Sequence, residues 1–129
     1  MNALVHTSSH GCWLVDLETE ELLATDEAKP ESQHVAVSLP RVVATAAVGS
    51  TVVAVVDVRP PLAVSHDAGR TWHESGGGLP TGTAVAIDED NPDRMLYAAR
   101  NRLFVSEDGG RFWRALSVEL PEITALAFV

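Results

Sequence analysis

The chain is poor in cysteine, in aromatic residues and in positive charge. It contains a single cysteine, Cys12, which excludes an internal disulfide. Nine Lys and Arg residues stand against 18 Asp and Glu residues, and the net charge is −9. A nucleic-acid-binding surface needs cations that displace the counterions of the phosphates. We therefore expect no nucleic-acid partner, and we interpret the acidic surface as an aid to solubility.

Long hydrophobic runs are also missing. No stretch approaches the roughly 20 apolar residues of a membrane helix, so no membrane partner is expected. The segment Met1–Leu17 has no basic start, and Asp16 interrupts it, so it does not resemble a signal peptide. An apolar fraction of 46% is typical of a globular domain. The sequence predicts one cytoplasmic domain over residues 1–129.

The chain repeats itself at a regular interval. Two octets, Ser65–Trp72 and Ser106–Trp113, both read S-x-D-x-G-R-x-W. Leu-Pro pairs that begin at Leu39, Leu79 and Leu120 keep the same spacing. Between these markers lie short runs rich in Val, Thr and Ile, bounded by Gly, Pro and Asp, without the apolar spacing of amphipathic helices. A period of roughly 40 residues with this composition predicts four-stranded β-propeller blades.

Three blades can be placed on the chain, and the first is incomplete. Blade two spans about 41–80, with strands at Val42–Val48, Thr51–Val56, Leu62–Val64 and Thr71–Glu74. Blade three spans about 81–121, with strands at Thr83–Ile87, Met95–Ala99, Leu103–Val105 and Phe112–Leu116. Blade one, about 1–40, has strands at Ala3–Thr7, Cys12–Val15 and Glu21–Thr25 but lacks an inner strand.

A spare strand at the C-terminal end, Ile123–Val129, fits the missing inner position of blade one. A second frame makes Asn2–His6 an inner strand and leaves the last strand unpaired. We prefer the first frame because it leaves no orphan strand.

The octets resemble the Asp-box, or BNR, repeat of sialidase-like, sortilin-type and photosystem II assembly-factor-like propellers. The octets carry the match, and looser blade similarity covers about residues 41–129. In those families the box lies away from the active face, so the resemblance implies a fold and a structural role. The residues with this expected role are Ser65, Asp67, Gly69, Trp72, Ser106, Asp108, Gly110 and Trp113.

Each octet should be a self-sufficient turn. Asp67 and Asp108 can accept hydrogen bonds from backbone N–H groups of their own turn. Gly69 and Gly110 stand where the backbone should need a positive φ. The tryptophans, Trp72 and Trp113, should open the outer strand and cover the gap between blades.

Three blades do not close a ring, because closed propellers have 4–8 blades. An open arc exposes two sheet faces and a strand edge, which favours aggregation. Two chains together supply six blades. We therefore expect a homodimer, a two-fold ring in which the strand Ile123–Val129 completes blade one of the other chain. The alternative is that the chain is a piece of a longer propeller or a decayed one.

No catalytic constellation stands out. Sialidase chemistry, as the resemblance implies it, needs an arginine triad and a tyrosine–glutamate pair, but the only tyrosine, Tyr97, lies in a predicted strand. Other glycosidases pair two carboxylates across a cleft, and Asp57 has no evident partner. The acidic run from Asp88 to Asp93 is interpreted as a solvated turn. His6, His10 and Cys12 are divided by a loop, so their spacing predicts no zinc site.

The connections between second and third strands offer one candidate site. Propeller ligands usually meet these loops, and here they carry the candidate ligand-binding residues His10, Asp57, Arg59, Arg100 and Arg102. Several arginines could recognise carboxylate or phosphate, or they could merely offset the acidic charge. We expect a non-catalytic binding or scaffolding module for a protein, peptide or small anion, without catalytic residue, metal or cofactor; the alternative is a glycosidase-like or sialidase-like hydrolase.

Overall fold

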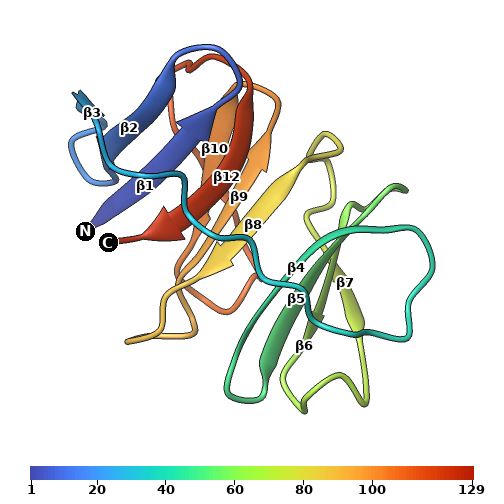
Figure 1. The fold of residues 1–129 in the computed structure, drawn as a ribbon. Coiled ribbons are helices and arrows are strands. Elements are labelled where there is room, and N and C mark those ends of the chain that lie inside the picture. The colour runs from blue at the N-terminus through green and yellow to red at the C-terminus, as the bar shows by residue number, and fades with distance from the viewer.

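The protein consists of three four-stranded antiparallel sheets and no helix (Figure 1), as a computed structural model of residues 1–129 shows. Sheet I contains β12 (Ile123–Phe128), β1 (Asn2–Thr7), β2 (Gly11–Asp16) and β3 (Leu22–Thr25). Sheet II contains β4 (Val42–Val48), β5 (Thr51–Val56), β6 (Leu62–Ser65) and β7 (His73–Ser75). Sheet III contains β8 (Ala84–Ile87), β9 (Met95–Ala99), β10 (Arg102–Ser106) and β11 (Arg114–Ala115). The expected all-β class is confirmed, and the sheets fit three propeller-like blades. No element is a helix able to cross a membrane.

The strands begin and end close to their predicted positions because turn residues bound each β-prone run. β4, β5 and β9 match the predicted ranges residue for residue. The outer strands of sheets II and III are the exceptions. β7 covers His73–Ser75 where Thr71–Glu74 was predicted, and only Arg114–Ala115 pairs where Phe112–Leu116 was predicted. Phe112 cannot start the strand, because its N–H donates to the Asp108 carboxylate in the preceding turn, at 3.0 Å.

The last strand completes the first sheet. β12 pairs antiparallel with β1, so that Leu4 lies opposite Ala127 and Val5 opposite Leu126. β12 thus takes the inner position of sheet I, the place that the preferred frame gives it, and the last strand is not left unpaired. In the structure β12 fills this place within its own chain, whereas exchange of the strand between two chains stays a prediction.

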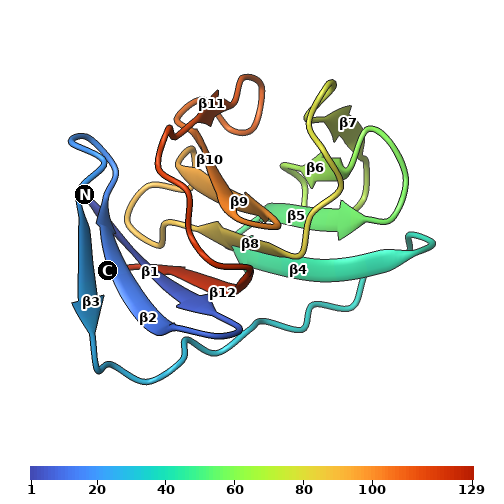
Figure 2. The same cartoon turned by 90° about the horizontal axis from the view of Figure 1, so that it is seen from above.

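Sheet III lies between the other two sheets and packs a face against each of them (Figure 2). Its inner strand β8 touches β4 on one side and β12 on the other. Leu96, Leu103 and Val105 join the core shared with sheet I. Met95, Tyr97 and Phe104 join the core shared with sheet II. The sheets thus form an arc in the order I, III, II, with one face of sheet I and one face of sheet II turned away from sheet III.

The three connections into the inner strands differ in length. Residues 76–83 and 116–122 lead into β8 and β12, and their leucines, Leu79 and Leu120, pack in the two cores between sheets. Residues 26–41, termed the linker, are about twice as long and cross from β3 to β4 past the other sheets (Figure 1). The linker spans the open side of the arc.

The two octets fold as the sequence predicts. The Thr71 N–H donates to the Asp67 carboxylate at 2.9 Å, and the Phe112 N–H donates to Asp108 in the same way. Gly69 and Gly110 have φ values of 86° and 88°. In each turn the serine hydroxyl donates to the aspartate and accepts from the glycine N–H. The serine and aspartate side chains of each octet therefore hold its own turn. One backbone N–H of each octet, at Ala68 and at Gly109, donates to a carbonyl outside the octet, at Ser50 and Asp93.

The tryptophans of the two octets differ in their surroundings. Trp113 packs on the core between sheets II and III, and its indole N–H donates to the Ser75 hydroxyl at 3.1 Å. It therefore covers the gap between two sheets, as predicted. Trp72 takes the same place on sheet II, but no sheet lies next to it on that side.

We expect Gly110→Ala to destabilise the protein by about 1–2 kcal/mol, because a residue with a Cβ resists the left-handed conformation. The added methyl group would also lie 3.1 Å from Val64. Gly77→Ala is the matched control, since a Cβ there meets open space. Urea unfolding of both variants measures the difference, and equal midpoints would contradict the role of the turn.

The Asp67 turn should make stability depend on pH. The Thr71 hydroxyl and N–H and the Ser65 hydroxyl hold the pKa of Asp67 below its ordinary value of 3.8. Because the folded state favours the carboxylate, its stabilisation is present above pH 3.8 and is lost as the pH falls below that value. The melting temperature of Asp67→Asn should therefore lie below that of the wild type at pH 6, and the difference should shrink as the pH falls further into the acidic range. Asp26→Asn, in the exposed linker, serves as the control; a difference that does not vary with pH would contradict the assignment.

Candidate functional site

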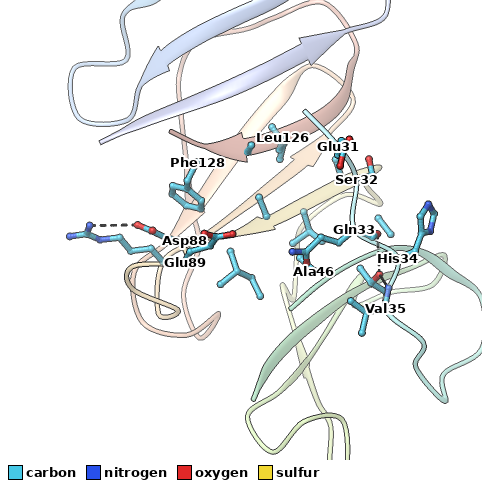
Figure 3. A pocket seen from close by; sticks show the side chains of 18 of the residues that line it. Glu31, Ser32, Gln33, His34, Val35, Ala46, Asp88, Glu89, Leu126 and Phe128 are labelled. Atoms are coloured by element: carbon cyan, nitrogen blue, oxygen red, sulfur yellow. Dashed lines mark hydrogen bonds and ion pairs between the residues drawn. The ribbon is translucent and has the colours of Figure 1, made fainter. Parts of the chain in front are cut away.

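A hollow lies beside the inner strands of all three sheets. Its volume is about 1090 Å³, and β4, β8, β12 and the linker surround it (Figure 3). Leu126 and Phe128 of β12 lie on one side, and Ala46 of β4 lies on the other. Fifteen of the 25 residues around it are hydrophobic, so the hollow has an apolar wall of the kind that ligand sites use.

An acidic turn borders this wall. Asp88, Glu89 and Asp90 follow β8 directly, so the end of the buried strand places them at the hollow. The Asp90 N–H donates to the Asp88 carboxylate at 2.9 Å, which fixes the start of the turn. The guanidinium of Arg94 lies 3.9 Å from the other Asp88 oxygen. Arg94 thus balances Asp88, while Glu89 and Asp90 are exposed and form no ion pair.

The linker forms the opposite wall. The Val35 N–H donates to the Thr45 hydroxyl at 2.9 Å, and the Gln33 side chain accepts from the Ala47 N–H of β4. These bonds fasten the linker to the free edge of the inner strand. Glu31 lies two positions before Gln33 and brings another carboxylate to the hollow (Figure 3).

The chemistry of the hollow suits a ligand that is both cationic and apolar. Glu31, Glu89 and Asp90 supply negative charge at its edge, and Leu126 and Phe128 supply apolar area. Lysine and arginine side chains combine a charged head with an aliphatic stem, which matches such a surface. The overall charge of −9 adds a long-range attraction for cations.

The predicted loop residues lie apart from this hollow, since none of them lines it. His10 is exposed and bonds to the Ser9 hydroxyl. Asp57 lies 3.9 Å from Arg41, and Arg102 donates to Glu119 at 3.0 Å. Arg59 is exposed.

Arg100 borders a smaller hollow with Asn101 and Glu122. Arg41 compensates the charge of Asp57, and Glu119 compensates that of Arg102. Anion binding at the predicted residues stays a prediction.

The acidic turn and the linker were the residues that sequence reasoning missed. The run Asp88–Asp93 was interpreted as a solvated turn, and the linker had no assigned role. One signal was available, because Glu89 and Asp90 immediately follow an inner strand whose end borders the centre of a propeller. The curve of the linker back to β4 had no signal at all.

The ionisable groups with shifted pKa values are held by structural contacts. Hydrogen bonds from the Phe112 N–H and the Ser106 hydroxyl lower the pKa of Asp108, and those from Ser117 lower the pKa of Glu20. Burial raises the pKa of Tyr97 to about 12, and its hydroxyl donates to the Pro80 carbonyl. Tyr97 is therefore a core residue between sheets II and III.

The histidines and the cysteine near the N-terminus have separate surroundings. His6 bonds to the Thr124 hydroxyl at 2.6 Å, and Cys12 is buried. No group of three or more His, Cys, Asp or Glu side chains is placed to hold a metal ion.

No protein-family model matches the chain, and no curated protein matches its sequence.

Proposed function

We propose that the protein is a non-catalytic binding or scaffolding module whose hollow receives a basic segment of a peptide or protein. The observation that carries this proposal is the hollow of about 1090 Å³ in which exposed carboxylates border an apolar wall. Such a surface attracts a lysine or arginine and then buries its stem. A small anion fits this hollow poorly, because Glu31, Glu89 and Asp90 repel it.

The hydrolase alternative has less support. A glycosidase needs an acid whose pKa is raised beside a carboxylate that stays ionised. The carboxyl groups with shifted pKa values are Asp16, Glu20, Asp67 and Asp108, and each of them is shifted downward. Their hydrogen bonds serve the turns and the contacts between sheets. A panel of chromogenic glycosides tests this alternative, and turnover that Asp57→Asn abolishes would contradict a purely non-catalytic role.

We further propose that the scaffold is an Asp-box propeller, closed as a six-bladed ring by two chains that exchange β12. Support comes from the turns at residues 65–72 and 106–113 and from the two sheet faces that no other sheet covers. The pairing of β12 with β1 is the same whether one chain or two supply the strands. The linker, which runs through positions 26–41 between β3 and β4, is long enough to act as the hinge of such an exchange.

The first experiment is a calorimetric titration with a short amidated peptide of alternating arginine and leucine. The double variant Glu89→Gln/Asp90→Asn should bind it about 3- to 10-fold more weakly, since each exposed charge contributes roughly 0.3–0.7 kcal/mol. Glu18→Gln/Glu107→Gln removes the same charge away from the hollow and should bind as the wild type does. A peptide of alternating glutamate and leucine should not bind. Equal weakening by both double variants would show that only net charge matters and would contradict the site.

Strand exchange has its own test in a Cys12→Ser background. Leu4 and Ala127 lie directly opposite each other on β1 and β12, so cysteines at these positions can form a disulfide. On a denaturing, non-reducing gel, exchange gives a covalent dimer. Leu4→Cys/Leu14→Cys joins β1 to β2 of the same hairpin and should run as a monomer. A monomeric band for both variants would contradict exchange.

A further inference from the structure

Sheet II packs on sheet III in the same orientation as sheet III packs on sheet I. The face of sheet II with Val53 and Val55 packs on the face of sheet III with Met95 and Tyr97. The opposite face of sheet III packs on the face of sheet I with Val5 and Val15. Each sheet therefore has a leading face, which meets the next sheet, and a trailing face, which meets the sheet before it. The leading face of sheet I and the trailing face of sheet II meet no sheet.

The leading face of sheet I resembles the two leading faces that are in use. Side chains alternate along a strand, so Leu4 and Leu14 point away from the core that holds Val5 and Val15. Inner strands carry an alanine pair at corresponding places of their leading faces, Ala44 and Ala46 in β4, Ala84 and Ala86 in β8, and Ala125 and Ala127 in β12. Leu23, opposite Leu14, is 65% exposed on this face.

The trailing face of sheet II already carries the residues that join sheets elsewhere. Trp113 and Leu79 lie at the contact of sheets II and III, each contributed by the trailing side of sheet III. Their counterparts one repeat earlier are Trp72 and Leu39. Trp72 stands on the trailing face because His73, the next residue, pairs with Val64 of the leading face.

A hydroxyl residue accompanies the tryptophan. Ser75 lies on the outer strand opposite Leu62, and its hydroxyl accepts from the indole N–H of Trp113. The β2–β3 turn of sheet I contains no tryptophan. On sheet III, which packs against sheet I, the position that corresponds to Ser75 is occupied by Leu116, which has no hydroxyl. In sheet I that place, opposite Cys12, is held by Thr25, which again carries a hydroxyl. A hydroxyl residue is thus expected at this position of a sheet when the next sheet supplies a tryptophan that can donate to it. For Thr25, the tryptophan that can do so is Trp72 of another copy.

We propose that the leading face of sheet I docks on the trailing face of sheet II of a second copy, with the Trp72 indole N–H donating to the Thr25 hydroxyl. Two such contacts close the ring of six sheets. This inference rests on the ring of six sheets proposed above. It identifies the contact between copies for chains that keep their own β12, because exchange through the linker would bring Thr25 and Trp72 of one chain together.

The linker now occupies part of the docking surface. It bonds to Thr45, whose side chain lies on the trailing face of sheet II because its neighbours Ala44 and Ala46 lie on the leading face. Val35, Val37 and Leu39 are half-buried, whereas Ala36 and Ser38 between them are exposed. This alternation indicates an extended strap laid on a surface. In the dimer the incoming sheet replaces the strap, and Leu39 enters the new core as Leu79 and Leu120 do in theirs.

The test is light scattering over a range of concentrations. The wild type should approach twice the chain mass of 13.8 kDa. Trp72→Phe and Thr25→Val should each weaken the dimer about 10- to 100-fold, because each dimer contains the hydrogen bond twice and one such bond changes affinity by about 3- to 10-fold. The double variant should be no weaker than either single variant, since both remove the same bond. Trp113→Phe removes the equivalent bond inside the chain and should lower the melting temperature without weakening the dimer.

A second variant guards against misfolding as an explanation. Leu23→Arg places a charge on a side chain that is exposed in the single chain, so the melting temperature of the monomer should not change while dimers are lost. Phe112→Arg, at a site that is 78% exposed outside the interface, should leave the dimer intact. A wild-type monomer at all concentrations would overturn the proposal, as would additive effects of Trp72→Phe and Thr25→Val. Open polymers would overturn the closed ring. Peptide binding by a monomer would leave the binding function standing and overturn the interface alone.

Discussion

The pairing of the last strand with the first holds the arrangement together. Without β12, sheet I would have three strands, and the core between sheets I and III would lose Ile123 and Leu126. The ladder from Leu4–Ala127 to His6–Ala125 joins residues at opposite ends of the chain. Such a contact has a high entropic cost of loop closure, so it forms only when packing against sheet III offsets that cost. The order of sheets, the course of the linker and the position of the hollow all depend on this pairing.

The rest of the scaffold is built from a few residue types, because the same turn and the same contact between sheets recur along the chain. Each octet turn fixes itself through a serine, an aspartate and a glycine, so the outer strand can be as short as β11. Alanines on the inner strands let adjacent sheets approach closely where they converge. Larger side chains such as Tyr97 and Trp113 fill the wider space toward the outer strands. Sheets built in this way stack in one sense, and the ends of the stack resemble its interior.

The hollow and the docking surface are linked by the linker, which borders both. Through Gln33 and Val35 it follows the free edge of β4, and through Glu31 it adds charge to the hollow. A move of the linker would therefore expose the trailing face of sheet II and widen the hollow at the same time. Ligand binding and assembly would then be thermodynamically coupled, because each would change the position of the same segment.

The sequence by itself determined the strands, the turns and their repetition. The repeat period, the octets and the Gly and Pro boundaries are local features, and local hydrogen bonds at Ser65, Asp67 and Gly69 form wherever the turn lies. Even the place of β12 could be predicted, because the first blade lacked an inner strand and the last strand of the chain belonged to no other blade.

Only the tertiary structure decided the candidate site. Asp57, in a loop, and Arg102, which was predicted in a loop but begins β10, had no partner in the sequence. Packing brought Arg41 and Glu119 beside them. The turn at Glu89 and Asp90 is an ordinary acidic turn until β12 and the linker, which are distant in the sequence, place an apolar wall beside it. Periodic patterns record what each segment does locally, whereas a hollow is made by segments that meet only when the sheets stack.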